Sequence, residues 1–342
     1  MTKPAKDLKG AKISRSEAVI LKAVAGSFLL EDRQSGAREL AFARGILRQR
    51  RHAPMPGDRV EYSASGDPDS PYIIEKVLPR KNYLVRPAIA NLDYLLITVA
   101  RTNPIPDYLL IDKLLLLALE NRIKPVLLLT KGDLDSGAGL EELLLNYYPT
   151  AVPIYLTQAG LSPDRDFFAA FKNSTVAFAG QSGAGKSSFL NRQFGEDLMA
   201  QGELSEKIQR GKQTTRHTEL FNYGDFYLAD TPGFQSLAIE QMDLTLESFA
   251  LAWPEIYQYA DYCRFNDCRH LGEAGCAVSP EIIGAERIAE MRLAIREKES
   301  KIKSGGFLRG LEENVLESWI YPARYERYKE LLKDFIAASK RY

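Results

Sequence analysis

The spacing of apolar and polar positions changes twice along the chain. Between residues 16 and 80, short apolar or alternating runs are separated by turn-forming residues. This pattern predicts strands at Ala18–Ala23, Ser27–Glu31 and Asp58–Ser63. Several short strands within about sixty residues favour a small barrel, with the five-stranded oligonucleotide-binding type as our prediction.

From about residue 83, longer apolar runs alternate with helical patterns. Tyr94–Ala100 is a continuous apolar run, which is typical of a strand buried on both faces, and a helical pattern follows at Asp107–Asn121. Strands that alternate with helices predict a doubly wound parallel sheet. The further predicted strands are Pro125–Leu129, Val176–Ala179 and Phe226–Ala229.

Helical patterns dominate after about residue 245. We therefore expect a multidomain protein with an all-β barrel, a central α/β domain and a mostly helical C-terminal domain. The predicted boundaries are 1–15 for a basic tail, 16–81 for the barrel, 82–245 for the α/β domain and 246–342 for the helical domain. The tail carries several lysines and is either a functional arm or a solvated terminus.

Composition limits where a polyanion can bind. The chain has 342 residues, and Lys plus Arg equals Asp plus Glu at 45 each, so its charge as a whole does not indicate nucleic-acid binding. Two local groups of basic residues are candidates for contact with RNA phosphates, and a merely solvated surface is the alternative. They are Arg44, Arg48, Arg50, Arg51 and Arg59 near the barrel, and Arg324, Arg327, Lys329, Lys333, Lys340 and Arg341 near the C-terminus.

The sequence favours a cytoplasmic protein without a membrane segment. Residues 1–15 are polar, and the most apolar stretch, Tyr108–Leu119, is interrupted by Asp112 and Lys113. Only three cysteines are present, which favours a metal site or free thiols over a disulfide framework.

The clearest chemical signal is a G-x-x-x-x-G-K-[ST] motif between a predicted strand and a helical pattern. Its glycines allow the backbone amides to surround a β-phosphate, and the helix N-terminus adds a positive dipole end. Lys186 is expected to contact the β- and γ-phosphates, and the Ser187 hydroxyl to bind magnesium. The motif comprises Gly180, Gln181, Ser182, Gly183, Ala184, Gly185, Lys186 and Ser187, followed by Ser188.

A second motif selects the base. Thr130, Lys131, Gly132 and Asp133 end a predicted strand and resemble the guanine motif Asn-Lys-x-Asp. The carboxylate would accept hydrogen bonds from the ring N–H and the exocyclic amine of guanine, which adenine cannot supply. Thr130 stands where Asn is usual, and a hydroxyl replaces only part of the amide's role in tethering the loop. An ordinary strand exit is the alternative.

The third motif is D-x-x-G at Asp230-Thr231-Pro232-Gly233. Asp230 is expected to hold magnesium through a water molecule, and the Gly233 amide to sense the γ-phosphate. Between this motif and the phosphate loop, either Thr214 or Thr215 is expected to act as the first switch.

The residue that orients the attacking water is not assigned by the sequence. His217, Thr214 and Thr215 are the candidates, although His217 is equally well explained as a polar loop residue. Phe234 occupies the position where many GTPases have Gln, which predicts slow intrinsic hydrolysis. The loop that contacts the guanine and ribose is expected near Tyr155–Gly160, where Leu156-Thr157-Gln158 is a degraded version of its usual motif.

The motifs occur in a permuted order, because the base motif precedes the phosphate loop. Loops at the carboxyl ends of parallel strands still meet in one crevice whatever their order in the chain. The second switch then leads within about fifteen residues into the helical domain, so its ordering can move that domain.

All three cysteines and one of the three histidines lie within a short segment. Three thiolates and one imidazole form a closed tetrahedral site for structural zinc, with no position left for a catalytic water. Free thiols in a loop are the alternative. The predicted ligands are Cys263, Cys268, His270 and Cys276.

Together, these motifs resemble the ribosome small-subunit-dependent GTPases of the RsgA/YjeQ family. The resemblance covers roughly residues 16–335 and includes Arg80-Lys81-Asn82 and Ala90-Asn91-Leu92-Asp93. It implies an oligonucleotide-binding barrel, a circularly permuted GTPase domain and a zinc domain. It also implies a cytoplasmic factor that acts late in maturation of the small ribosomal subunit.

We expect a monomer that uses magnesium with GTP and binds the small subunit and its rRNA. The GTP form is expected to bind the subunit more tightly, and hydrolysis to release it. A nucleotide-gated RNA-binding scaffold and an ATP-dependent P-loop enzyme are the competing hypotheses, and Asp133 argues against the second.

Overall fold

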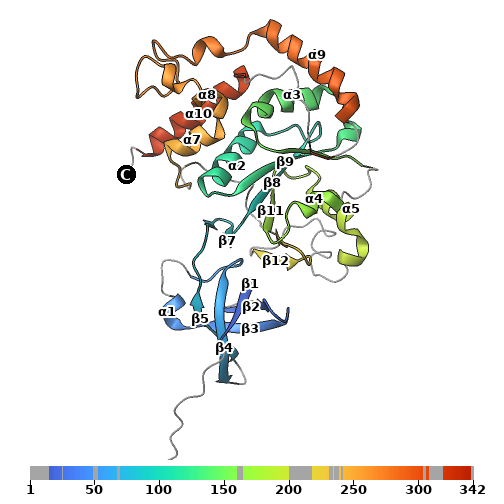
Figure 1. Ribbon diagram of the computed structural model, residues 1–342, viewed down its shortest axis with the longest axis vertical. Coiled ribbons are helices and arrows are strands. Elements are labelled where there is room, and N and C mark those ends of the chain that lie inside the picture. Colours follow the sequence, from blue (N-terminus) through green and yellow to red (C-terminus); the bar gives the residue numbers. More distant parts are fainter. Residues whose placement is uncertain are drawn as a thin grey trace, which may run out of the picture. The chain divides into compact units, whose positions relative to one another are not determined.

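The computed structural model divides into two compact units, Met1–Asn91 with Arg216–Phe221, and Leu92–Thr215 with Asn222–Tyr342 (Figure 1). The structure describes residues 15–24, 26–48, 53–67, 70–159, 165–199, 218–230, 234, 239, 242–302, 306–307 and 319–339. The predicted basic tail therefore lies outside the described residues, apart from Arg15.

The first unit contains a closed five-stranded barrel, as predicted. Its strands pair in the order β1-β2-β3-β5-β4, and β4 closes the barrel by pairing with β1. Only the β3–β5 pair is parallel. The short helix α1 (Gly45–Arg48) lies between β3 and β4 in the chain. The strands are β1 (Ser16–Val24), β2 (Ser27–Asp32), β3 (Arg38–Ala43), β4 (Arg59–Asp67) and β5 (Ser70–Val77).

Apolar side chains fill the barrel because alternate strand positions point inward. Ala18, Ile20, Leu30, Val60 and Ile74 have no exposed surface. A further strand, β12 (Glu219–Asn222), pairs antiparallel with β1, where Lys22 lies opposite Glu219 and forms an ion pair with it at 3.1 Å. The hairpin of β6 (Tyr83–Val85) and β7 (Ala88–Ala90) completes this unit.

The second unit contains the predicted parallel sheet. Its strands lie in the order β10-β9-β8-β11-β13, and all four pairings are parallel. Their interiors are almost entirely buried, as continuous apolar runs require. The strands are β8 (Tyr94–Ala100), β9 (Lys124–Thr130), β10 (Ile154–Leu156), β11 (Thr175–Ala179) and β13 (Tyr227–Asp230).

Helices cover both faces of this sheet. Figure 1 shows α2 (Tyr108–Glu120) and α3 (Ala138–Tyr147) on one face, with α4 (Arg165–Ala169) and α5 (Lys186–Met199) on the other. The Asp107 side chain caps α2 by accepting from the Leu110 amide at 2.9 Å. The predicted helical pattern therefore begins and ends at the two cap residues of α2.

The remaining helices pack beside α2 and α3 in the same unit. They are α7 (Leu246–Ala252), α8 (Pro254–Tyr257), α9 (Ala285–Ile302) and α10 (Pro322–Ser339). Phe249, Trp253 and Tyr328 form an aromatic centre, with Tyr328 edge-on to both other rings. The short strand β14 (Gly306–Phe307) pairs antiparallel with β10.

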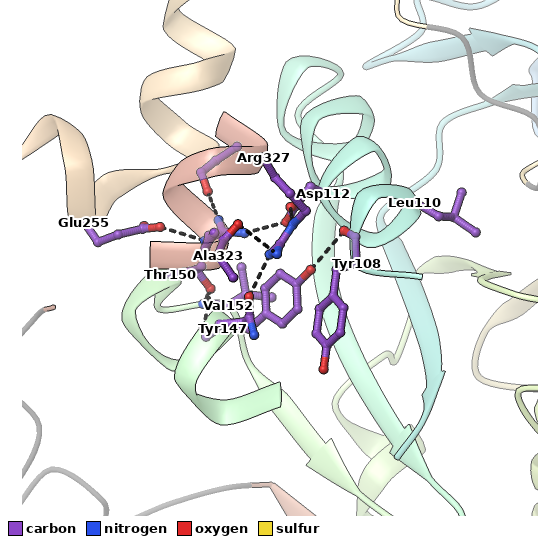
Figure 2. Close-up of polar contacts among 12 residues, drawn as sticks. Tyr108, Leu110, Asp112, Tyr147, Thr150, Val152, Glu255, Ala323 and Arg327 are labelled. Carbon is purple, nitrogen blue, oxygen red and sulfur yellow. Dashed lines mark hydrogen bonds and ion pairs between the residues drawn. The ribbon is translucent and has the colours of Figure 1, made fainter. Parts of the chain in front are cut away.

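A buried ionic network joins α10 to α2 and α8 (Figure 2). The Arg324 guanidinium donates to Asp112 of α2 and to Glu255 of α8, the latter at 2.6 Å, and Arg327 donates to the other oxygen of Asp112. Arg324 also lies 5.0 Å from the ring centres of both Tyr147 and Trp253. Asp112, which seemed in the sequence to be a charge interrupting an apolar helix, is completely buried and neutralised.

Within the described residues, none of the helices has both the length and the apolar composition that a bilayer crossing requires.

Candidate nucleotide site and metal centre

The predicted nucleotide motifs follow three strands of one parallel sheet. The phosphate loop follows β11, the base motif ends β9, and Asp230 ends β13. Because the strands are parallel, these loops leave the same edge of the sheet. The strand β8 lies between β9 and β11, so its exit loop adjoins both the base motif and the phosphate loop.

The phosphate loop has the backbone that its glycines allow. Gly180, Gly183 and Gly185 all have positive φ, between 76° and 123°. A side chain at Gly180 would also meet the Thr98 carbonyl oxygen at 2.2 Å, so this position requires glycine for space as well as for conformation. The loop continues into α5, which begins at Lys186 and is anchored by the fully buried Phe189.

The Lys186 ammonium folds back onto its own loop. Its Nζ donates to the carbonyls of Gly180 at 2.8 Å and Gln181 at 2.9 Å. Burial lowers the pKa of Lys186 to about 8. Both carbonyls are substitutes for the phosphate oxygens that such a lysine would bind in a nucleotide complex.

Thr130 ties the base motif to the phosphate loop. Its buried hydroxyl donates to the Ala184 carbonyl at 2.5 Å and lies 3.3 Å from the Val99 carbonyl. A Cβ at Gly185 would lie 3.4 Å from the Thr130 hydroxyl, an ordinary van der Waals distance, so it is the positive φ of 93° that favours glycine there. A single hydroxyl therefore makes the link that we expected to be only partly preserved when Asn is absent.

Asp133 and Lys131 are held by neighbouring loops. The Asp133 carboxylate accepts from the Ala159 amide at 2.9 Å, and Lys131 donates from its Nζ to the Asn103 carbonyl at 2.6 Å. Ala159 lies in the loop expected near Tyr155–Gly160, but the sequence did not assign this individual contact, because a backbone amide can come from any residue type. The loop after β10 thus adjoins the base motif although Leu156-Thr157-Gln158 does not match the usual pattern.

The switch residues are placed only in part. Asp230 ends β13, but its side chain and Gly233, Thr214, Thr215, His217 and Gln235 lie outside the described residues. Phe234 is only 2% exposed. At the position where many GTPases have a glutamine, this chain therefore has a buried apolar side chain that cannot orient water.

The four predicted metal ligands form one cluster. The ligand atoms of Cys263, Cys268, His270 and Cys276 all lie within 4.8 Å of one another. The His270 Nδ1 lies 3.5 Å from the Cys263 sulfur and 3.7 Å from the Cys276 sulfur. Burial raises the pKa of the Cys268 thiol to about 12, a shift that a bound cation reverses because it favours the thiolate.

Hydrogen bonds around the cluster hold its backbone. Glu273 accepts from the amides of Leu271 at 2.7 Å and Arg269 at 3.1 Å. From α10, Tyr325 donates to the His270 carbonyl and Tyr328 to the Arg269 carbonyl, both at 2.8 Å. The ligand set and this supporting shell fit a metal ion with thiolate and imidazole ligands.

The prediction of a basic surface near the C-terminus is partly wrong. Arg324 and Arg327 belong to the buried network, so neither is available to RNA phosphates, and Lys329 is paired with Glu326 at 2.7 Å. In the barrel, Arg44 pairs with Glu75. Arg59 pairs with Glu17, while Arg50, Arg51, Lys340 and Arg341 and the side chain of Arg48 lie outside the described residues.

Comparison with known proteins gives concordant matches. The family model described as RsgA GTPase matches residues 77–240. The small ribosomal subunit biogenesis GTPase RsgA of Ruminiclostridium cellulolyticum is 38% identical over 264 residues, covering 76% of this chain and 85% of the relative. The protein of the same name from Bacillus subtilis is 35% identical over 280 residues, covering 79% and 92%.

Solved structures agree with the architecture. YloQ, described as a circularly permuted GTPase, has a TM-score of 0.64 at 25% identity, with 97% of this chain and 98% of that chain covered. YjeQ from Thermotoga maritima has a TM-score of 0.63 at 25% identity, with 94% and 99% covered. The predicted permuted α/β fold and the predicted barrel are thus confirmed.

Proposed function

This chain belongs to the RsgA GTPase family, and from that premise we propose that it hydrolyses GTP in late maturation of the small ribosomal subunit. One observation carries the proposal. The phosphate loop, Thr130 and the Asp133 loop are joined by hydrogen bonds at one edge of a single sheet. The relatives named above are small ribosomal subunit biogenesis GTPases, which supports the choice of partner.

The nucleotide would bind across these loops. Amides of Gly180–Ser188 would surround the phosphates, and Lys186 would exchange its two carbonyl partners for phosphate oxygens. Ser187 and Asp230 would hold magnesium, and the Gly233 amide would contact the γ-phosphate. Thr214, Thr215 and His217 remain the candidates for the first switch and for the water-orienting group.

Asp133 would confer preference for guanine. Its Oδ1 accepts a hydrogen bond from the Ala159 amide, and a guanine edge would supply two further donors to the carboxylate. Asp133→Asn is expected to lose preference for GTP over ATP, because the amide no longer offers two acceptors. Binding of fluorescent GDP in competition with GTP and ATP measures this preference, and equal affinity of the wild type for both would contradict a GTPase site.

The metal at Cys263, Cys268, His270 and Cys276 is proposed to be a single structural zinc ion. Three soft thiolates and an imidazole are the ligands that zinc takes in closed sites. Because all four positions come from the protein, the ion would fix the segment and take no part in hydrolysis. Metal analysis of native protein is expected to show one zinc per chain.

The nucleotide would control binding to the small subunit. A partner stabilises ordered switches only if it binds that state more tightly, so the GTP form should bind and the GDP form should leave. The barrel is the proposed RNA-binding part, since five-stranded barrels of this topology bind oligonucleotides. The factor is proposed to act as a cytoplasmic monomer.

Turnover and co-sedimentation test this cycle together. GTP hydrolysis is expected to be slow for the protein alone, where buried Phe234 replaces the usual glutamine, and to rise strongly with purified small subunits. Sedimentation with subunits should be stronger with a non-hydrolysable GTP analogue than with GDP. Nucleotide-dependent binding without a rise in turnover would instead identify a gated scaffold, and neither effect would reject the small subunit as partner.

A further inference from the structure

Arg101 lies in the middle of the proposed base-recognition site, although no nucleotide motif includes it. It directly follows β8, and its amide donates to the Thr130 carbonyl at 3.1 Å. The residue is only 8% exposed. Its side chain is therefore packed inside the protein beside the base-motif loop, Thr130–Asp133, and does not extend into solvent.

Two glycines make room for Arg101. A side chain at Gly132 would lie 2.9 Å from both Cζ and Nη1 of the Arg101 guanidinium, and one at Gly139 would lie 2.1 Å from the Arg101 carbonyl oxygen. Gly132 does not have positive φ, so its backbone conformation is open to other residues. The guanidinium thus occupies the space that a side chain at position 132 would enter.

Hydrogen bonds hold the base-motif loop on both sides of Gly132, and the Lys131 side chain is tied to the Asn103 carbonyl at 2.6 Å. Thr130 is tied to the phosphate loop and Asp133 to Ala159. Beyond the motif, Asp135 accepts from the amides of Gly139 at 3.0 Å and Leu140 at 2.9 Å and so fixes the start of α3. Between these anchors, Lys131 has a left-handed backbone with φ 57°, a conformation that is unfavourable for a side-chain-bearing residue.

We propose that Arg101 is a positioning residue for guanine recognition, because its guanidinium supports the Lys131–Asp133 backbone from beneath at the glycine. This inference deepens the proposed GTPase function and rests on it. A planar guanidinium has few conformations when packed against a peptide, so it supports the loop more rigidly than a flexible chain of the same size. Arg101 sets where the Asp133 carboxylate stands and does not itself touch the base.

Arg101→Ala tests the support directly. The KM for GTP and the Kd for GDP are expected to rise about tenfold or more, because a small misplacement of a recognition group weakens every contact it makes. The kcat at saturating GTP should stay within about twofold of wild type, since the phosphate loop keeps its own anchors. Arg287→Ala, which removes an exposed arginine from α9, is the matched control.

Base selectivity separates positioning from a general loss of stability. Inosine triphosphate lacks the exocyclic amine that Asp133 would bind, so the ratio of GTP to inosine triphosphate affinity reports where that carboxylate stands. The ratio should fall for Arg101→Ala and stay unchanged for Arg287→Ala. A variant that is merely less stable would lower the melting temperature and the active fraction, but would keep the ratio.

Gly132→Ala gives a reciprocal test. When Arg101 is present, the new methyl group should displace the guanidinium and weaken the binding of guanine nucleotides, as Arg101→Ala does. In the Arg101→Ala background, the same methyl group meets no guanidinium and should cause little further loss, so that the two changes are strongly non-additive.

The outcomes also distinguish failure of the proposed GTPase function from failure of the role assigned to Arg101. If wild-type protein shows no preference for GTP over ATP, the proposed function fails first. If that preference is present but Arg101→Ala keeps the wild-type KM and selectivity, the supporting role of Arg101 is rejected alone. Additive losses from Arg101→Ala and Gly132→Ala would likewise reject it.

Discussion

In the proposed nucleotide complex, Lys186 leaves the two carbonyls of its own loop. Its pKa in this state is lowered to about 8 by burial, whereas phosphate oxygens would favour the charged form and raise the pKa again. Nucleotide binding therefore takes up a proton at any pH between the two values, and binding must weaken as pH rises through about 8.

This linkage predicts a pH profile for nucleotide affinity. Between pH 7 and roughly 9, the Kd for GDP should rise by up to about tenfold per pH unit once pH exceeds the pKa of free Lys186. Isothermal titration in buffers of different ionisation enthalpy would count the proton directly. Guanosine, which has no phosphates, should show a much smaller change, and equal slopes for guanosine and GDP would contradict the role of Lys186.

Thr130 makes a similar single-group prediction. Thr130→Val keeps the volume but leaves the Ala184 carbonyl without its donor, at a cost of about 1–3 kcal/mol to the loop. We expect nucleotide affinity to fall by roughly tenfold, which corresponds to about 1.4 kcal/mol. Thr130→Ser keeps the hydroxyl and should stay close to wild type. Similar losses for both substitutions would show that the methyl group, and not the hydrogen bond, matters.

At this scale, sequence patterns predicted groups with a distinctive chemistry and missed those without one. The geometry of Thr130 agrees with the expected tether, and the cysteines and His270 do lie together. Ala159 contributes only its backbone amide, and Arg101 fills space beside Gly132. Neither contact can be recognised from a sequence motif. Arg324 was misjudged because a sequence displays the charge without showing the buried carboxylate opposite it.

The segment Cys263–Cys276 is expected to depend on its proposed metal ion for its fold. Tyr325 and Tyr328 of α10 donate to its backbone, so loss of the metal should disturb that helix as well. A strong zinc chelator is expected to reduce the near-ultraviolet circular dichroism of the aromatic cluster around Trp253 and to lower the unfolding midpoint.

Re-addition of zinc should restore the signal, and Arg269→Ala, next to the ligands, is the matched control that should keep the response to chelator. A chelator that changes neither the spectrum nor the midpoint of a zinc-loaded sample would contradict the structural role.

Element boundaries were predicted best where local chemistry marks them. β8 begins and ends where the apolar run does, and Asp107 and Asn121 are the two caps of α2. The three-residue strand β10 was missed, because it is too short for a periodic pattern and depends on its pairing with β9. Short strands of this kind are defined by the sheet they join.

At the scale of the whole molecule, α10 completes the core of the second unit, which contains the predicted nucleotide motifs. Arg324→Ala would leave Asp112 and Glu255 buried without that cation, and breaking such a pair costs about 3–5 kcal/mol. The free energy of unfolding in urea should fall by that amount, with the loss seen in the sheet and in the helices alike. Lys329→Ala, which removes a pair on the surface of α10, should change it by less than about 1 kcal/mol.

If the loss from Arg324→Ala were no larger than that from Lys329→Ala, the network would not hold the helices to the sheet.

The attachment of the C-terminal helices to the sheet also bears on the permuted motif order. The strand β13 ends at Asp230, and α7 begins at Leu246 with its cap residue Thr245 bonded to Glu120 of α2 at 3.1 Å. The segment predicted to contain the second switch therefore begins at a strand and ends at a helix cap of the same unit.

The buried network also constrains the order in which a newly made chain can finish folding. Synthesis runs from the N-terminus, and Arg324 is made 212 residues after Asp112 and 69 residues after Glu255. After Glu255 is made, the emerging polypeptide has both carboxylates destined for burial and still lacks the cation that neutralises them. A product of interrupted translation would expose this part of α2 and α8, where chaperones and proteases act. Synthesis of α10, which carries Arg324, Arg327 and Tyr328, thus marks the point at which the second unit can complete its core.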